Sequence, residues 1–142
     1  MLERVDIADF ERDFDAIRAV RFAVFVEEQQ VPAEIEMDSR DPECIHVLAL
    51  DRAGRAIGTG RIDLQRDGKI GRMAVLASER GRGVGRALLD ALHECARVRG
   101  QRTVWCHAQV SAQSFYERSG YVADGDTFLE AGIPHVHMRR EL

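Results

Sequence analysis

Residues 80–86 read RGRGVGR, with three glycines at alternate positions and three arginines, directly before a run with the pattern of an amphipathic helix. Glycine at these positions lets successive backbone N–H groups turn inward and lets an anion approach the backbone closely. A helix that begins there adds the positive end of its dipole. The side chains of Arg80, Arg82 and Arg86 would hold further oxygens of the same anion. The stretch therefore predicts a phosphate-binding loop that suits a diphosphate.

Two other glycine-rich nucleotide loops lack a defining residue here. A Rossmann fingerprint needs its third glycine at position 86 if counted from Gly81, or at 88 if counted from Gly83, and those positions hold Arg86 and Leu88. A Walker A loop needs Gly-Lys-Ser/Thr, and no lysine is nearby. A plain surface turn is the remaining alternative, but a strand before the loop and a helix after it favour phosphate binding.

The elements before the loop follow from the spacing of apolar residues. Asp9 is placed to cap a helix whose apolar residues recur every three or four positions toward Phe25. Residues 27–43 are polar and predict a loop with one helical turn. Strands are expected at three places, the first two as a hairpin: residues 44–51, 56–64 and 70–76.

The elements after the loop complete an alternating pattern. An apolar stripe from Val84 to Cys95 marks a helix that ends at Gly100. A strand at 102–108 follows, then a short helix at 112–119 and two more strands within 121–142. This order of hairpin, strand, helix, strand, helix and strands predicts an α/β protein with a mixed sheet and helices on its faces.

Composition sets broad limits on the function. The chain has 142 residues, which predicts a single domain over residues 1–142. Its net charge of −4 argues against a nucleic-acid partner bound by bulk attraction. No apolar run approaches the roughly 20 residues of a membrane helix, and the acidic N-terminus does not resemble a secretory signal. The three cysteines form no CxxC pair and predict free thiols in a cytoplasmic protein.

The loop also carries a family resemblance. Arg80, Gly83 and Gly85 are similar to the Arg/Gln-x-x-Gly-x-Gly/Ala motif of the GNAT acyl-CoA N-acyltransferases. The stretch "SAQSFYERSGYV" resembles a later segment of that family, and "RFAVFVEEQQVP" and "GIPHVHM" resemble its ElaA-like branch, near the glyphosate-type small-molecule acetyltransferases. These stretches occur in the family's order over most of the chain. The resemblance implies the GNAT fold, a mixed and mostly antiparallel sheet splayed into a V with helices on both faces.

The same resemblance implies where acetyl-CoA binds as co-substrate. Its pantetheine would lie along residues 73–75 like an added strand, with the diphosphate on the glycine-rich loop. The backbone N–H of Val75 is then a candidate donor to the oxyanion, while its side chain belongs to the core. The cofactor-binding residues expected are Met73, Ala74, Val75, Arg80, Gly81, Arg82, Gly83, Val84, Gly85 and Arg86.

Acetyl transfer needs a proton for the departing thiolate and a neutral amine. A phenol of ordinary pKa, about 10, is protonated at neutral pH, and the resemblance implies that Tyr116 is the general acid; packing beside Phe115 is the alternative. His135 resembles the base of the glyphosate-type relatives. The alternatives are Glu28 as base, a chain of water molecules as base, or a purely structural role for His135.

His135 and His137 could form a metal site, but no third residue at a spacing typical of metal ligands accompanies them, so no metal is expected. The remaining histidines are interpreted as structural, namely His46, His93 and His107. Of these, His107 is the candidate for an exception.

Recognition of the acceptor is less clearly encoded. Arg21 and Arg72 stand where the glyphosate-type relatives bind an acidic substrate. Each would bind a carboxylate of the substrate or else pair with the acidic loop from Glu27 to Asp41. Gln109 replaces a further arginine of those relatives, which argues against a doubly anionic acceptor. The sequence thus predicts direct acetyl transfer to a small-molecule amine in a ternary complex. A protein N-acetyltransferase and a non-catalytic acyl-CoA sensor are the alternatives, and a homodimer is left open.

Overall fold

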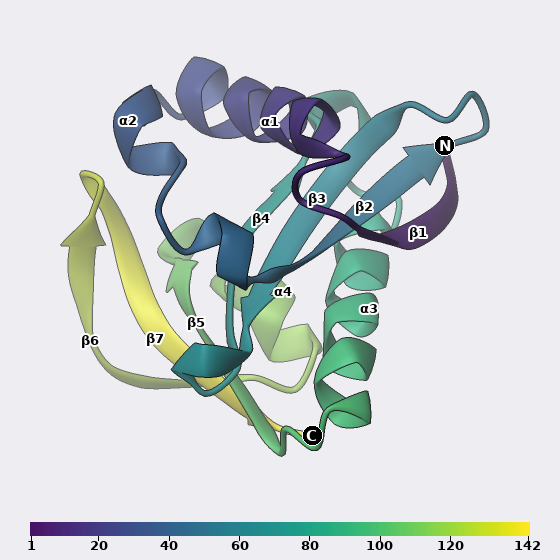
Figure 1. Ribbon diagram of the computed structural model, residues 1–142. Helices are drawn as coiled ribbons and strands as arrows, with labels where there is room; N and C mark the ends of the chain where they lie inside the picture. The colour runs from purple at the N-terminus through teal and green to yellow at the C-terminus, as the bar shows by residue number, and fades with distance from the viewer.

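The computed structural model describes residues 1–142 and contains one seven-stranded sheet with helices on both faces (Figure 1). The strands lie in the order β1-β2-β3-β4-β5-β7-β6, and every neighbouring pair is antiparallel except β4 with β5. The strands are β1 (Leu2–Ala8), β2 (Ile45–Asp51), β3 (Ala56–Asp63), β4 (Lys69–Val75), β5 (Thr103–Gln109), β6 (Val122–Glu130) and β7 (Ile133–Glu141). The helices are α1 (Phe14–Arg21), its π-helical continuation η1 (Phe22–Glu28), α2 (Ala33–Glu36), α3 (Val84–Val98) and α4 (Gln113–Arg118), with short 3₁₀ turns η2 (Asp41–Glu43), η3 (Leu64–Arg66), η4 (Ala77–Glu79) and η5 (Val110–Ala112).

The sheet is split between its two parallel strands. β4 and β5 pair at only two positions, which lie at the start of β4 and in the middle of β5, and the second of them joins Ile70 to Cys106. The register of β4 against β3 then shifts, and Arg72 in this bulge has a φ of +50°. Because a bulge bends and twists its strand, β4 turns away from β5. The predicted V is therefore confirmed, with β1–β4 in one arm and β5, β7 and β6 in the other (Figure 1).

Helices cover each face by burying the apolar stripes seen in the sequence. Helix α3 packs against β1 to β4, and Leu88, Leu89 and Leu92 are fully buried in the larger core cluster. On the other face α1 and η1 lie over β3 and β4, where Val24 and Phe25 belong to a second, smaller cluster. None of the helices has the length and apolar character needed to cross a membrane.

Three boundaries at the N-terminal end differ from the predictions. The sequence predicts no element at residues 2–8, yet they form β1 and pair with β2. Charged residues interrupt this edge strand, so its apolar pattern is weak. The first helix begins at Phe14 rather than after Asp9, whose carboxylate instead caps the preceding turn by accepting the N–H of Arg12 at 2.8 Å. The helical run continues past Phe25 to the end of η1. The polar loop contains α2, which is the helical turn that the sequence predicts, and also η2.

Candidate active site

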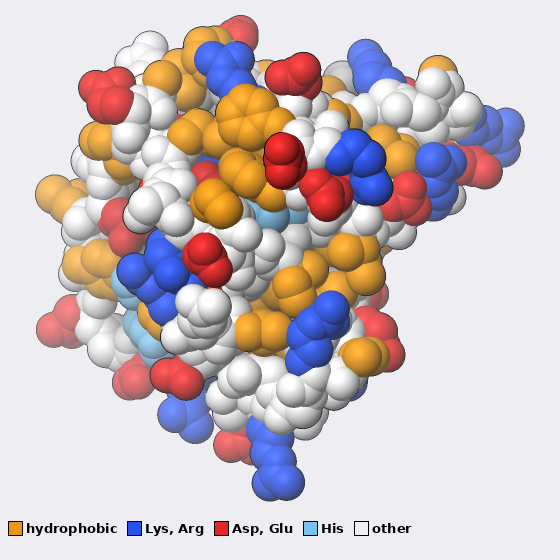
Figure 2. All heavy atoms as spheres, viewed as in Figure 1, with side chains coloured by type: hydrophobic (Ala, Val, Ile, Leu, Met, Phe, Trp, Pro, Cys, Tyr) orange, Lys and Arg blue, Asp and Glu red, His pale blue; other side chains and the backbone are white.

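A cleft of about 900 Å³ opens where β4 and β5 diverge. The glycine-rich loop lines one part of it, and the hairpin of β6 and β7 lines another, together with β5. Helix α4 contributes Phe115 and Tyr116, and the segment from Gln29 to Arg40 supplies a further wall. Histidine side chains lie beside basic and acidic ones over β5 and β7 (Figure 2). The cleft therefore connects the glycine-rich loop with a group of titratable side chains.

The glycine-rich loop presents a run of free hydrogen-bond donors. The backbone N–H groups of residues 81–86 have no acceptor within the protein. Gly81 and Gly83 have φ values of +75° and +82°, and a Cβ at either position would meet no atom within 4 Å. Helix α3 begins at Val84, so its positive dipole end lies at the same place. These features fit the phosphate-binding loop that the sequence predicts.

The backbone of β4 has a free edge toward the split. The N–H of Leu76 donates to the oxygen of Ile57 on β3 at 3.0 Å, so by the alternation of a strand the N–H of Val75 points to the opposite edge. The oxygen of Val75 lies on that same edge and accepts the Nε–H of Arg80 at 3.0 Å. An extended ligand chain would pair with this edge as an added strand.

Glu28 is held by the arginine that begins the loop motif. Its two carboxylate oxygens accept the two Nη donors of Arg80, each at 2.6 Å. The hydrogen bond from Arg80 lowers the pKa of Glu28, and Glu28 does not line the cleft. A carboxylate so bound is a poor proton acceptor, which argues against Glu28 as general base. It instead occupies the guanidinium group of Arg80, for which it would compete with a bound phosphate.

Tyr116 reaches the cleft from α4. Its ring packs edge-on against Phe115 and Tyr121, with centroids 5.1 and 5.4 Å away, and the residue is 6% exposed. The hydroxyl group of Tyr116 has no hydrogen-bond partner in the protein. Every fully buried side-chain polar atom of the chain does have a partner, so this hydroxyl is not fully buried and opens to the cleft. Burial raises the pKa of Tyr116. The phenol therefore keeps its proton at neutral pH.

His135 lies on β7 with a defined tautomer. Its Nδ1 is 2.6 Å from the backbone oxygen of Ile133. Because a carbonyl oxygen only accepts hydrogen bonds, Nδ1 carries the hydrogen and Nε2 has the free lone pair of the neutral ring. The residue lines the cleft and lies opposite Gln109 and Phe128 on the neighbouring strands. This tautomer suits a general base that acts through Nε2.

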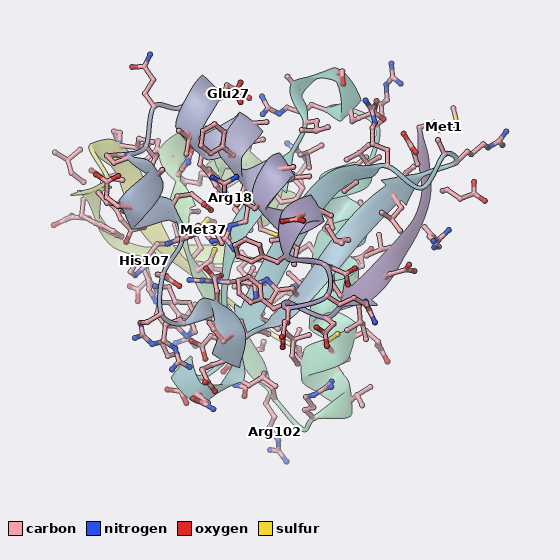
Figure 3. The ribbon with its side chains drawn as sticks, turned by 45° about the horizontal axis from the view of Figure 1, so that its top comes forward. Met1, Arg18, Glu27, Met37, Arg102 and His107 are labelled. Atoms are coloured by element: carbon pink, nitrogen blue, oxygen red, sulfur yellow. The ribbon has the colours of Figure 1, made fainter.

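Glu130 connects His135 with His107, a pairing that the sequence does not predict. Its Oε1 accepts the Nδ1–H of His107 at 3.0 Å, and its Oε2 is 3.7 Å from Nε2 of His135. All three side chains line the cleft, and Figure 3 shows His107 on the side of the molecule where α2 and the β6–β7 hairpin lie. No group of three or more His, Cys, Asp or Glu side chains is arranged to hold a metal ion.

Two other histidines are structural, as the sequence predicts. The Nε2 of His46 lies 2.8 Å from the backbone oxygen of Asp41, and burial lowers its pKa. The Nε2 of His93 lies 2.7 Å from the hydroxyl of Tyr121, and burial together with the charge of Arg140 lowers its pKa to about 4. Both rings are about 1% exposed and lie outside the cleft.

Arg21 does not occupy the position expected of an acceptor-binding residue. It is fully buried and forms ion pairs with Glu36 and with Asp41, the latter at 2.8 Å. It does not line the cleft. The expectation that Arg21 binds the acceptor is therefore corrected, because its charge is compensated within the protein, where it holds α1 to the acidic loop.

Arg72 lines the cleft but is also engaged by the acidic loop. Its Nε donates to the backbone oxygen of Glu36 at 2.9 Å, and an Nη lies 3.2 Å from Asp38. Arg61 binds Asp38 as well, at 2.8 Å. Burial by itself raises the pKa of Asp38. The hydrogen bond and positive charge of Arg61, together with the charge of Arg72, outweigh burial and lower this pKa to about 2. These arginines fix the wall of the cleft.

A pair of amide side chains bridges the split. Gln109 on β5 donates to Gln29 at 2.8 Å, and Gln29 donates back at 3.4 Å. Gln29 follows η1 directly, so the pair joins the segment over β4 to the other arm of the V. The sequence contains no signal for this contact or for Glu130, because each partner is distant along the chain.

Comparison with known proteins places the chain in a family. Residues 12–142 match the Acetyltransferase (GNAT) domain. The uncharacterized N-acetyltransferase YjcF of Bacillus subtilis is 40% identical over 124 residues, which cover 86% of this chain and 88% of YjcF. The crystal structure of an acyl-CoA N-acyltransferase from Pseudomonas aeruginosa superimposes with a TM-score of 0.84 and 29% identity, covering 99% of each chain.

The chain therefore belongs to the GNAT family of acetyltransferases, whose donor is an acyl-CoA. Within that family it is ElaA-like, as the sequence motifs predict. Escherichia coli ElaA is 32% identical over 133 residues, which cover 89% of this chain and 86% of ElaA. Its crystal structure superimposes with a TM-score of 0.85 and 28% identity over 99% of this chain and 100% of that one.

Proposed function

We propose that the protein is an acetyl-CoA-dependent N-acetyltransferase that moves the acetyl group directly to the amine of a small molecule in a ternary complex. The observation that carries the proposal is the cleft at the split, which joins the anion-binding loop to Tyr116 and His135. Two substrates bound from its two ends would meet beside β4. Holding them together in this way replaces a collision between free molecules by a reaction within one complex.

The donor would be bound mainly by backbone groups. The N–H groups of residues 81–86 suit the diphosphate, with the side chains of Arg80, Arg82 and Arg86 around them. The free edge at Met73–Val75 suits pantetheine, since Ala74 between them pairs with Thr59 of β3. When bound there, acetyl-CoA supplies an activated acyl group.

Three groups of the chain would act on the reacting atoms. The N–H of Val75 donates to the carbonyl oxygen as negative charge develops. The hydroxyl of Tyr116 gives a proton to the departing thiolate, and Nε2 of His135 takes a proton from the amine. Glu28 is left out because Arg80 holds its carboxylate outside the cleft.

A small acceptor is favoured over a protein because side chains bridge one part of the cleft and the acidic loop forms one of its walls. Gln29 and Gln109 join across the split, and the acidic loop is held against the sheet by Arg21, Arg61 and Arg72. A non-catalytic sensor would need the glycine-rich loop alone. It would need neither the free hydroxyl of the buried tyrosine nor the histidine tautomer with a free Nε2. We also propose a cytoplasmic location, which the three unpaired thiols support.

Turnover of acetyl-CoA against a panel of amines tests the proposal. Tyr116→Phe should lower kcat by about a hundredfold or more, in the range of lost acid catalysis. Tyr121→Phe is the matched control, because it removes the chain's other phenol hydroxyl, which contacts His93 at 2.7 Å outside the cleft. It should leave kcat within about threefold of the wild-type value. Tight CoA binding without turnover of any amine would favour the sensor.

A further inference from the structure

Glu130 and His135 bring two polar atoms together in the cleft without a hydrogen bond between them. Nδ1 of His135 donates to the oxygen of Ile133, so Nε2 is the ring nitrogen left for another partner. Oε2 of Glu130 is 3.7 Å from Nε2, which is beyond hydrogen-bond distance, and has no hydrogen-bond donor from the protein. When the ring is neutral both atoms are acceptors, so a bound group with at least two N–H donors and positive charge can hydrogen-bond to both.

The surroundings hold these two groups in place. Oε1 of Glu130 accepts the Nδ1–H of His107 at 3.0 Å, which fixes the carboxylate. The ring of Phe128 is stacked with His135 at 6.1 Å and lies edge-on to His107 at 4.9 Å. His135 is 6% exposed, while the side chain of Glu130 is 45% exposed and lines the cleft. The pair is therefore rigid on its inner side and open on its outer side.

No lysine or arginine side chain neutralises Glu130. Its only ion-pair contacts within 4.0 Å are the two histidines, His107 and His135. Lys69, the single lysine of the chain, also lines the cleft but lies over the ring of Trp105 at 5.1 Å and forms no ion pair. The arginines that line the wall nearby are taken up by other acids, as with Arg72 and Asp38. The carboxylate charge remains available to a ligand.

We propose that Glu130 and His135 form a binding site for the ammonium group of the acceptor, so that the substrates are basic aliphatic amines captured in their protonated form. A primary ammonium has three N–H donors, one for Oε2 and one for Nε2. Apolar side chains in the same cleft, among them Ile35, Phe25 and Ile133, suit the carbon chain of such an amine. This inference rests on the proposed function and names its substrate class.

The site also accounts for the protons of the reaction. One proton passes from the ammonium to Nε2 of His135, which leaves a neutral amine. The amine nitrogen then forms its bond to the acyl carbon as the carbon–sulfur bond breaks. The second proton lost by nitrogen balances the one gained by the thiolate, so each turnover releases one proton, which leaves from His135. The charge of Glu130 favours the protonated ring while the acyl group is transferred.

Binding of benzylammonium to the CoA-loaded protein tests the site without turnover, followed by the imidazole NMR resonances of His135 and His107. Glu130→Gln keeps an oxygen to accept from His107 but removes the charge. It should weaken benzylammonium binding about tenfold or more, as expected for a lost charge-assisted contact. Asp126→Asn is the matched control, because Asp126 is an exposed acid on the same strand outside the cleft, and it should bind within threefold of wild type.

Turnover then separates this inference from the proposed function. With benzylamine as acceptor Glu130→Gln should lower kcat/KM at least tenfold, and the loss should be clearly smaller with aniline, which is neutral at pH 7.5 and makes no charge-assisted contact with Glu130. Benzylammonium binding to Glu130→Gln with wild-type affinity, or equal losses for both amines, would overturn the ammonium site. Histidine shifts on binding without acetyl transfer to any amine would instead support the site and overturn the proposed function.

Discussion

Replacement of Gly83 by aspartate should remove most of the affinity for CoA without unfolding the protein. A Cβ at Gly83 meets no atom within 4 Å, so the new side chain has room beside the free N–H groups of residues 81–86. The left-handed backbone, with φ of +82°, costs a non-glycine residue about 1–2 kcal/mol of stability. A carboxylate about 5 Å from one diphosphate charge costs roughly 3 kcal/mol of binding at an effective dielectric constant of about 20. That repulsion corresponds to about a hundredfold in Kd.

Gly125→Asp is a matched control for this prediction. Gly125 also has a φ of +82° with nothing within 4 Å of a Cβ, so it shares the backbone strain and the change of charge, but it lies on β6 outside the cleft. Titration calorimetry with CoA should give a Kd about a hundredfold higher for Gly83→Asp and within threefold of wild type for the control, with similar melting temperatures. The difference should shrink as salt is added. Equal CoA affinity in the two variants would refute the phosphate-binding role of the loop.

Two further predictions concern charged groups. Glu28→Gln frees the guanidinium group of Arg80, so CoA affinity should rise by up to about fivefold, because a solvent-exposed ion pair is worth at most about 1 kcal/mol. Calorimetry measures this change beside the control Glu27→Gln. A weaker CoA affinity of Glu28→Gln would contradict competition between Glu28 and phosphate for Arg80. The folded-state pKa of Asp38, about 2, lies below its unfolded value, so its contribution to stability is present above pH 4 and is lost as the pH falls toward 2. That contribution is about 2 kcal/mol, so in urea unfolding Asp38→Asn should be less stable than wild type at pH 7 and should lose less stability between pH 4 and 2. Parallel stability curves for the two proteins would disprove it.

The geometry of the glycine-rich loop and most of the fold were accessible from the sequence because their determinants are local. The groups of the glycine-rich loop are consecutive, so their types and spacing specify the turn, its free N–H groups and the helix that follows. The apolar stripe of α3 and the short strands are periodic patterns within one segment. The weaker pattern of β1 failed to predict a strand, because an edge strand with one partner needs little apolar surface.

The acceptor side depends on contacts between residues that are far apart in the chain. Arg21 has the same charge whether it binds a substrate or a carboxylate of its own protein, and only the packing of α1 against the acidic loop buries it beside Glu36 and Asp41. Glu130 and His107 belong to strands that meet through β7, so neither spacing nor composition indicates their contact. Consecutive residues by themselves determine a local feature such as the glycine-rich loop. The ion-pair partner of a charged side chain, and therefore the role of that side chain, is determined only when the chain has folded.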